Sequence, residues 1–176
     1  MTKKYSRFAP VVALVLCLLL GMAALSGCSG DKAGDKAGGT AAQDSYPKLD
    51  MPALEKRLAD NKGGKVTLIM FWATWCPACK TELPVLEQLR AKYPADKLEI
   101  LAVSVDDTEQ VMRSYVATRP TTLPILLGTA DVSTSFGVKS IPALVIFDRE
   151  SQVAFNSTGA YPFEMLDSVI SQLVKG

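Results

Sequence analysis

The fold of this chain is decided by the segment Phe71-Trp72-Ala73-Thr74-Trp75-Cys76-Pro77-Ala78-Cys79-Lys80. It completes an apolar run, residues 66–72, whose β-branched and aromatic side chains are typical of a strand buried on both faces. Beyond the segment, apolar residues recur at helical spacing at Leu83, Leu86, Leu89 and Tyr93. The two cysteines therefore lie between a strand and the helix that follows it, where a Cys-x-x-Cys pair indicates a dithiol/disulfide redox site.

The start of this helix predicts different roles for the two thiols. Pro77 suits the first helical position, because its fixed φ matches the helix and its missing N–H would have had no partner. Cys76 then lies beside unpaired backbone N–H groups and the positive end of the helix dipole, which favour a thiolate. We therefore expect Cys76 to attack a substrate disulfide, and Cys79, about one turn further, to resolve the mixed disulfide.

Residue counts exclude several other kinds of site. The chain has 4 cysteines and no histidine, so Cys-His and Ser-His nucleophile pairs and histidine metal ligands are absent. Cys17 and Cys28 belong to the N-terminal segment described below, which leaves Cys76 and Cys79 as each other's disulfide partners. A structural zinc site takes four ligands, mostly sulfur or imidazole. We therefore expect neither a metal nor another cofactor.

The remaining pattern predicts one α/β domain. Further strands are expected at residues 98–105, 123–127 and 143–147, and a turn at 148–152 predicts a hairpin into 153–155. Further helices are expected at 108–117 and around Phe163, Leu166, Ile170 and Leu173. This order predicts a central mixed sheet with helices on both faces. The length of 176 residues suits one domain, and a net charge of +1 gives no support for a nucleic-acid partner.

The N-terminus has the layout of a secretory signal peptide. Basic residues at Lys3, Lys4 and Arg7 precede an apolar run and a small-residue stretch that ends at Cys28. An uncleaved membrane helix is the alternative, because the apolar stretch approaches the ~18 residues that span a bilayer. The sequence Leu25-Ser26-Gly27-Cys28 argues against that alternative, since it resembles the lipobox of bacterial lipoproteins.

The lipobox resemblance implies a definite organisation. Residues 1–27 would be removed, and a lipidated Cys28 would hold the protein on a membrane outside the cytoplasm, facing the periplasm in a double-membraned bacterium. Residues 28–46 contain a doubled Asp-Lys-Ala-Gly and no large apolar side chain before Tyr46, which predicts a flexible linker. The folded domain is then expected at residues 47–176.

The redox segment also resembles a known family. Residues 71–84, together with residues 103–107, 123–127 and 136–148, are similar to the TlpA/ResA group of extracytoplasmic thiol-disulfide oxidoreductases. The resemblance implies a thioredoxin-like fold, with the insertion of that group between the two main strands. It also implies a disulfide reductant for partner proteins, for example in cytochrome c maturation, supplied with electrons by a membrane thiol-disulfide donor.

The resemblance assigns further site residues. Pro142 matches a cis-proline that faces the redox pair, and the backbone beside it, at Ile141, would pair with a substrate chain. Trp75 matches a tryptophan that flanks the nucleophile, although a packing aromatic is an equally good interpretation. With Pro77, these residues form the expected substrate contact. Pro84 would kink the helix as it does in the family.

One position departs from thioredoxin itself. Met70 replaces the buried acid of thioredoxin; Glu82 is a possible substitute, but a solvated helix residue is the favoured interpretation.

Two other functions remain open. A peroxidase of the peroxiredoxin type is the first alternative, although Ala73 and Ile69 replace the threonine and proline of that class. A Cu(I)-binding or delivery module is the second, although related copper proteins add a histidine that this chain lacks.

Overall fold

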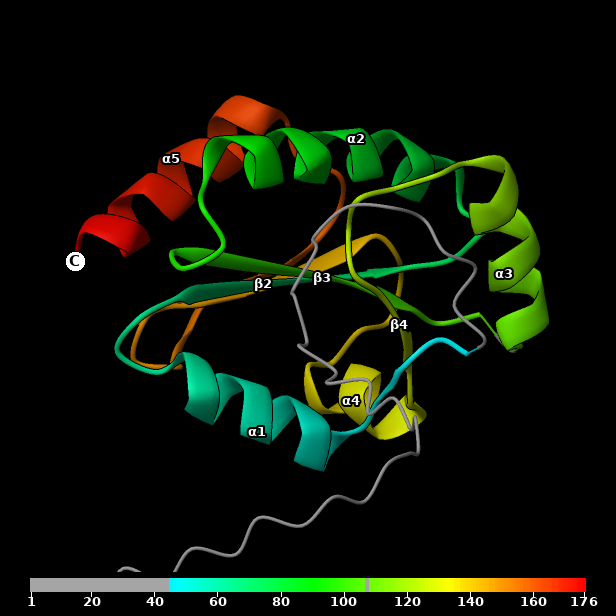
Figure 1. Ribbon diagram of the computed structural model, residues 1–176, viewed down its shortest axis with the longest axis horizontal. Coiled ribbons are helices and arrows are strands. Elements are labelled where there is room, and N and C mark those ends of the chain that lie inside the picture. Colours follow the sequence, from blue (N-terminus) through cyan, green and yellow to red (C-terminus); the bar gives the residue numbers. More distant parts are fainter. Residues whose placement is uncertain (1–44, 107) are drawn as a thin grey trace, which may run out of the picture. The chain divides into compact units, whose positions relative to one another are not determined.

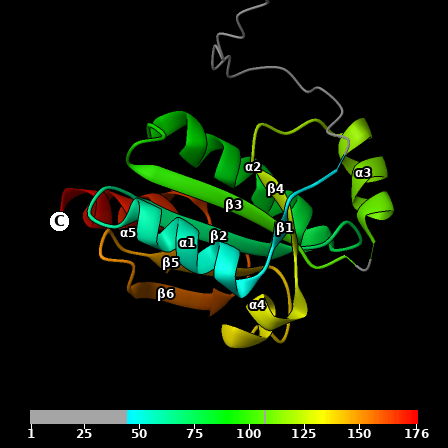
Figure 2. The ribbon, with the colours of Figure 1, turned by 60° about the horizontal axis from the view of Figure 1, so that its bottom comes forward.

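A six-stranded sheet forms the centre of residues 45–106 and 108–176, which are the residues that this computed structural model describes. The strand order is β1-β4-β3-β2-β5-β6. The strands are β1 (Lys48–Leu49), β2 (Val66–Trp72), β3 (Leu98–Ser104), β4 (Ile125–Gly128), β5 (Ala143–Phe147) and β6 (Val153–Thr158). The first four are parallel, whereas β5 and β6 run antiparallel to their neighbours, so the sheet is mixed (Figures 1 and 2).

Helices cover both faces of the sheet, as the sequence predicts. Figure 1 shows α2 (Pro77–Lys92) and α5 (Phe163–Lys175) on one face, and α1 (Met51–Asn61) and α4 (Ala130–Ser135) on the other. The remaining helix, α3 (Glu109–Thr118), packs its buried Met112 into the core on the α2 side. The expectations for residues 1–27, for Cys28 and for most of the linker lie outside the described residues.

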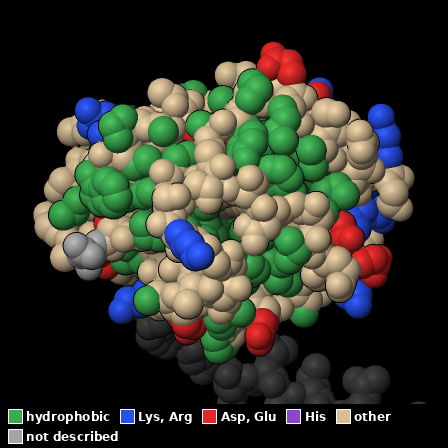
Figure 3. All heavy atoms as spheres, turned by 180° about the vertical axis from the view of Figure 1, so that it is seen from behind, with side chains coloured by type: hydrophobic (Ala, Val, Ile, Leu, Met, Phe, Trp, Pro, Cys, Tyr) green, Lys and Arg blue, Asp and Glu red, His purple; other side chains and the backbone are tan. Residues whose placement is uncertain are grey.

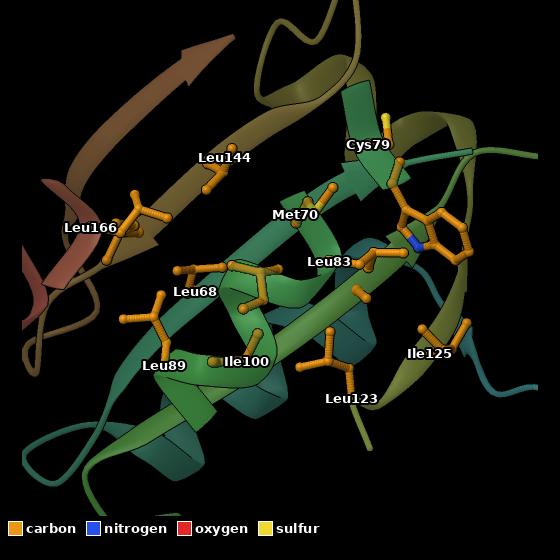
Figure 4. Packing of buried hydrophobic residues seen from close by; sticks show 14 of the residues in the cluster. Leu68, Met70, Cys79, Leu83, Leu89, Ile100, Leu123, Ile125, Leu144 and Leu166 are labelled. Atoms are coloured by element: carbon orange, nitrogen blue, oxygen red, sulfur yellow. The ribbon is translucent and has the colours of Figure 1, made fainter. Parts of the chain in front are cut away.

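The central strand β2 shows why this arrangement is stable. Every residue of β2 is buried, and side chains alternate between the two faces. Leu68, Met70 and Trp72 join the core beneath α2 and α5, as Figure 4 shows for the first two together with Leu83 and Leu89 of α2. Ile69 and Phe71 join the second core beneath α1 and α4. The continuous apolar run in the sequence is therefore confirmed as a strand buried on both faces.

Most of the predicted elements are confirmed, with small shifts at their ends. The strands at 66–72 and 143–147 and the hairpin into β6 are present, and α3 begins one residue after its capping residue Thr108. The strand predicted at 123–127 begins only at Ile125, because Pro124 has no N–H to donate to a strand ladder. The strand predicted at 98–105 ends at Ser104. The short β1, α1 and α4 were not predicted.

The sheet ends at β6, which has no neighbour on its outer side among the described strands. Seen from this side, hydrophobic side chains cover much of the surface and most charged side chains lie near its margin (Figure 3). Val153 at the start of β6 is 51% exposed. In the part of the chain that the structure describes, no helix is both long and apolar enough to cross a bilayer.

Candidate active site

The two cysteines lie at the beginning of α2, directly after the central strand. Cys76 is the N-cap residue and Pro77 occupies the start of the helix, as predicted. The Sγ of Cys76 accepts a hydrogen bond from the backbone N–H of Cys79, with 3.1 Å between sulfur and nitrogen. The two cysteines form a disulfide, and their Cα atoms lie 5.3 Å apart. The helix start therefore presents a backbone donor to the Cys76 sulfur.

The two sulfurs differ in their surroundings. Cys79 is completely buried, and Cys76 is 4% exposed. Around Cys76, Trp75 is 68% exposed, and Pro77 and Ala78 are also exposed. An incoming sulfur therefore meets the Cys76 side of the disulfide first, while Cys79 lies behind it in the core.

A loop distant in sequence lies against Cys76. The peptide bond between Ile141 and Pro142 is cis. The carbonyl oxygen of Ile141 lies 3.8 Å from the Sγ of Cys76, although 65 positions separate the two residues. The carbonyl oxygen of Pro142, in turn, accepts a hydrogen bond from the N–H of Gly159 at 2.8 Å. The structure thus brings Cys76, Cys79, Trp75, Pro77 and the Ile141–Pro142 bond together at one end of the sheet.

Asp106, whose role was not predicted from the sequence, fixes the loop between β2 and α2. Its carboxylate accepts from the backbone N–H of Thr74 at 3.0 Å and from the Thr74 hydroxyl at 2.9 Å. It also accepts from the hydroxyl of Ser104 at 2.8 Å, and the Asp106 N–H donates back to that hydroxyl at 3.1 Å. Thr74 lies two residues before Cys76, so this network holds the chain that leads into the redox pair. The sequence signals for Asp106 were its position just beyond a buried strand and its place in residues 103–107, which resemble the TlpA/ResA group.

Glu82 is buried, which corrects the expectation of a solvated side chain. Its position on a helix favoured a solvated side chain, but Glu82 is only 1% exposed. Its Oε2 accepts a hydrogen bond from the N–H of Tyr161 at 2.9 Å, and its Oε1 is buried without a partner among the described residues. Burial raises the pKa of Glu82 above its ordinary value, and the bond from Tyr161 opposes that rise only in part. The face of α2 that carries Cys79 continues one turn later to Glu82, which explains the burial.

A buried acid is therefore present on α2, whereas β2 carries none. Met70 is completely buried in the core and cannot exchange a proton. Glu82 lies three residues after Cys79, which places the two side chains on the same side of α2. A buried carboxyl group with a raised pKa near a buried thiol is a candidate for proton transfer.

A pocket of about 310 Å³ lies between α2 and α3, and the residue that follows Cys79 on α2 forms part of its wall. Its lining includes Trp72, Lys80, Leu83, Tyr115, Arg119 and Ile125. Two cations lie over the ring of Tyr115: Lys80 Nζ is 5.5 Å and Arg119 Cζ is 4.8 Å from its centroid. The described residues contain no group of three or more His, Cys, Asp or Glu side chains that could hold a metal ion.

A redox-active Cys-x-x-Cys at the start of a helix, after the central strand of a mixed sheet and beside a cis-proline, defines a thioredoxin-like thiol-disulfide oxidoreductase. Comparison with known proteins agrees with this class. The chain belongs to the AhpC/TSA family, whose model matches residues 39–156. Within it, the similarities described next identify an enzyme of the ResA/TlpA type.

Two relatives and one solved structure illustrate the similarity. The chain is 27% identical over 175 residues to a thiol-disulfide oxidoreductase ResA of Bacillus cereus, a match that covers 98% of this chain and 99% of the relative. It is 38% identical over 99 residues to the thioredoxin-like protein YneN of Bacillus subtilis, covering 54% of this chain and 57% of that relative. A putative thiol:disulfide interchange protein DsbE from Chlorobium tepidum superposes with a TM-score of 0.61 and 27% identity, over 66% of this chain and 84% of the other.

Proposed function

We propose that this oxidoreductase is a disulfide reductant for partner proteins, and that it works outside the cytoplasm while anchored to a membrane by lipid on Cys28. The assignment of Cys76 as the attacking thiol rests on the difference between the two cysteines: Cys76 is at the helix start, and Cys79 is buried behind it. The lipobox resemblance supports the anchor. The similarity to a thiol-disulfide oxidoreductase ResA supports disulfide exchange. The resemblance to the TlpA/ResA group implies a reductant, with maturation of cytochrome c as one use of the electrons.

The reaction proceeds in two exchange steps. In the reduced protein, the Cys76 thiolate attacks one sulfur of the substrate disulfide; a mixed disulfide forms, and the other substrate sulfur leaves as a thiolate that takes up a proton. The Cys79 thiolate then attacks the Cys76 sulfur, which forms the Cys76–Cys79 disulfide and releases the second substrate thiol. Two electrons pass to the substrate. A membrane thiol-disulfide donor returns the protein to its dithiol form.

Glu82 supports the second step. Cys79 is completely buried, so its thiol needs a nearby base before it can attack. The carboxylate of Glu82 is one turn along α2, has a buried Oε1 with no partner among the described residues, and has a raised pKa. In this proposal, the carboxylate of Glu82 accepts the proton of the Cys79 thiol. Glu82 thereby takes the role that a strand residue would have if Met70 were acidic.

The substrate contact in this proposal consists of Trp75, Pro77, Ile141 and Pro142. Trp75 offers a large exposed aromatic surface beside the nucleophile, and aromatic residues of this kind contribute strongly to protein interfaces. The backbone at Ile141 lies next to the Cys76 sulfur. A substrate chain that pairs with this backbone would bring its disulfide to Cys76.

The test has two parts, both on the purified protein. A redox titration of the Cys76–Cys79 couple by thiol trapping should give a potential near that of thioredoxin, about −270 mV, or lower. A value near about −120 mV, typical of strong oxidants, would overturn the assignment as a reductant. Cys79→Ser should accumulate mixed disulfides with substrate proteins at Cys76, and Cys76→Ser should abolish exchange.

The two alternatives make different predictions. Peroxidases of the peroxiredoxin type carry a threonine and a proline where this chain has Ala73 and Ile69, so we expect no catalytic consumption of hydrogen peroxide. Steady peroxide turnover that depends on Cys76 would favour the peroxidase. Stoichiometric retention of Cu(I) through repeated buffer exchange would favour the copper module.

A further inference from the structure

We propose that the pocket between α2 and α3 binds a segment of the partner protein that carries a large apolar side chain and an acidic residue close to the reacting cysteine. This inference names the substrate class of the reductant and therefore rests on the proposed function. Nothing in the redox chemistry of Cys76 and Cys79 requires this pocket. Its charges, its walls and its position each point to the same occupant.

The first observation is two cations that have no acidic partner among the described residues. Lys80 and Arg119 both lie over the ring of Tyr115, and both side chains are exposed. Four ion pairs occur in the part of the chain that the structure describes, and neither of these two cations takes part in them. A cation held over an aromatic ring is directed while it keeps its charge available to a ligand.

The carboxylate in the pocket wall does not neutralise them. Glu87 accepts hydrogen bonds from Thr122 N–H at 2.8 Å and from the hydroxyls of Thr121 and Thr122. Burial raises the pKa of Glu87, but these hydrogen bonds outweigh it, so the pKa is lowered and the group stays ionised. Its oxygens are thus directed at the two threonines rather than at Lys80 or Arg119. The exposed charge at the pocket is positive.

The second observation is the apolar interior. Leu83 of α2 and Ile125 of β4 are buried side chains that form part of the wall. The ring of Tyr115 packs on Trp72, with 5.6 Å between centroids, and adds an aromatic surface. A volume of about 310 Å³ is at the lower end of ligand sites, so it suits one large side chain rather than a cofactor. An apolar side chain accompanied by an acid complements this pocket.

The third observation is the position of the pocket along α2. Lys80, Pro84 and Glu87 follow Cys76 at intervals of four, four and three residues, so they continue the stripe of the helix that begins at the nucleophile. At about 1.5 Å per residue, Lys80 lies about 6 Å and Pro84 about 12 Å along the axis from Cys76. An extended chain covers about 3.3 Å per residue. A residue two to four positions from the substrate cysteine therefore reaches the pocket.

Synthetic disulfide peptides test the proposal. The probe is a peptide with the core Cys-Gly-Ser-Phe-Glu-Glu, oxidised to its homodimer, and the matched peptide has Gln in place of both Glu. The rate constant for reduction of each peptide by the reduced protein is measured in single turnover at low ionic strength. The ratio of the two rate constants is the readout, because a change in Cys76 reactivity affects both peptides equally and cancels.

The variant to compare is Lys80→Gln/Arg119→Gln. Its control is Lys62→Gln/Lys97→Gln, which removes the same charge from two exposed lysines near the N-terminal ends of β2 and β3, opposite the redox pair. In the wild type we expect the acidic peptide to react about threefold to tenfold faster, a preference that salt reduces. The ratio should fall to about one in the pocket variant and stay at the wild-type value in the control.

The outcomes separate this inference from the proposed function. If the wild type reduces both peptides equally fast, the pocket proposal is wrong while the reductant stands. An equal loss of preference in the control double variant also overturns it, since the effect would then come from overall charge. In a further peptide, Phe is replaced by Ser. If this peptide is reduced as fast as the original and the preference for Glu persists, the apolar part of the pocket proposal is wrong. If neither peptide is reduced, both proposals fail.

Discussion

The carboxylate of Glu82 accepts a hydrogen bond from the backbone N–H of Tyr161, with 2.9 Å between Oε2 and nitrogen, although 79 positions separate the residues. This bond joins α2 to the loop between β6 and α5. It leaves the buried Oε1 without a partner among the described residues. A buried polar atom of this kind costs free energy and calls for a functional explanation. Proton exchange with Cys79 provides one.

Glu82→Gln should slow the resolving step. Glutamine keeps the size of the side chain and an oxygen for Tyr161, but it cannot take the proton of Cys79. We expect release of the substrate from the mixed disulfide to slow by about tenfold or more near neutral pH, because general-base catalysis contributes at least that much. Stopped-flow measurement of this release tests the prediction. Glu164→Gln, at an exposed position on α5, is the control; equal rates in all three proteins would remove Glu82 from the mechanism.

The same variant should change how stability depends on pH. Since the pKa of Glu82 is raised in the folded protein above its ordinary 4.5, the folded chain binds more protons than the unfolded chain between these two values. The wild-type free energy of unfolding therefore loses a contribution as pH rises through that interval. Glutamine does not titrate, so the difference, variant minus wild type, should increase from pH 4 to pH 8. Urea unfolding of both oxidised proteins measures it; a difference that decreases with pH would contradict the raised pKa.

Asp106→Asn should impair the redox loop specifically. An amide replaces one of the two carboxylate oxygens, so the bonds to Thr74 and Ser104 cannot all be kept. We expect a loss of about 1–3 kcal/mol in the free energy of unfolding. Because Thr74 leads into Cys76, we also expect the exchange rate with a peptide disulfide to fall by about tenfold.

Asp148→Ala separates the effect of Asp106→Asn on stability from its effect on exchange. Asp148 likewise organises a loop, since its Oδ1 accepts from the N–H groups of Glu150 and Gln152 in the turn between β5 and β6. That turn lies at the opposite end of β5 from Pro142. Asp148→Ala removes this acceptor and one negative charge, as Asp106→Asn also removes one, and it should therefore lower stability without slowing exchange. If Asp106→Asn is destabilised but exchanges at the wild-type rate, Asp106 is structural only.

The central part of the fold could be predicted because its signals are local. The strands at 66–72 and 143–147 are continuous apolar runs, and the redox helix combines Pro77 with leucines at helical spacing. The helix α1 was missed although it also has local signals, namely the N-cap Asp50, whose side chain accepts from Ala53 N–H, and a proline at its start. The two-residue β1 has no such signal. It exists because β4 offers it a parallel partner.

The site was predictable only where its residues are adjacent in sequence. Sequence spacing within one helical turn sets the geometry of Cys76, Pro77 and Cys79. The roles of Ile141 and Pro142, by contrast, came from a family resemblance. Glu82 was misjudged because its burial depends on the distant loop at Tyr161, which covers that side of α2. Asp106 was missed for a similar reason, since its partner Thr74 lies 32 positions away. Tertiary contacts, rather than sequence spacing, assign these two acids.

Trp75→Ala should reduce exchange with protein substrates while leaving stability nearly unchanged. Its side chain is 68% exposed, so removing it disturbs little packing, but it takes away the aromatic surface beside Cys76. We expect a decrease of about tenfold in the second-order rate constant with a protein disulfide, and less with a small disulfide. Val153→Ala removes another exposed apolar side chain, 51% exposed, at the opposite end of the sheet. An equal effect of the two substitutions would exclude a specific contact at Trp75.

Gly128→Ala should destabilise the sheet where β4 lies between β1 and β3. A Cβ added at Gly128 would lie 2.6 Å from Val103 Cγ1 and 3.3 Å from the carbonyl oxygen of Ser104. Val103 is completely buried and β-branched, so it cannot move aside freely. We therefore expect a loss of about 1–3 kcal/mol in the free energy of unfolding, as for other overpacked sites. In the control Gly64→Ala, the nearest contact is 3.6 Å, to Asn61 O, so chemical denaturation should show a much smaller change; equal losses would mean that steric crowding at Val103 is not the cause.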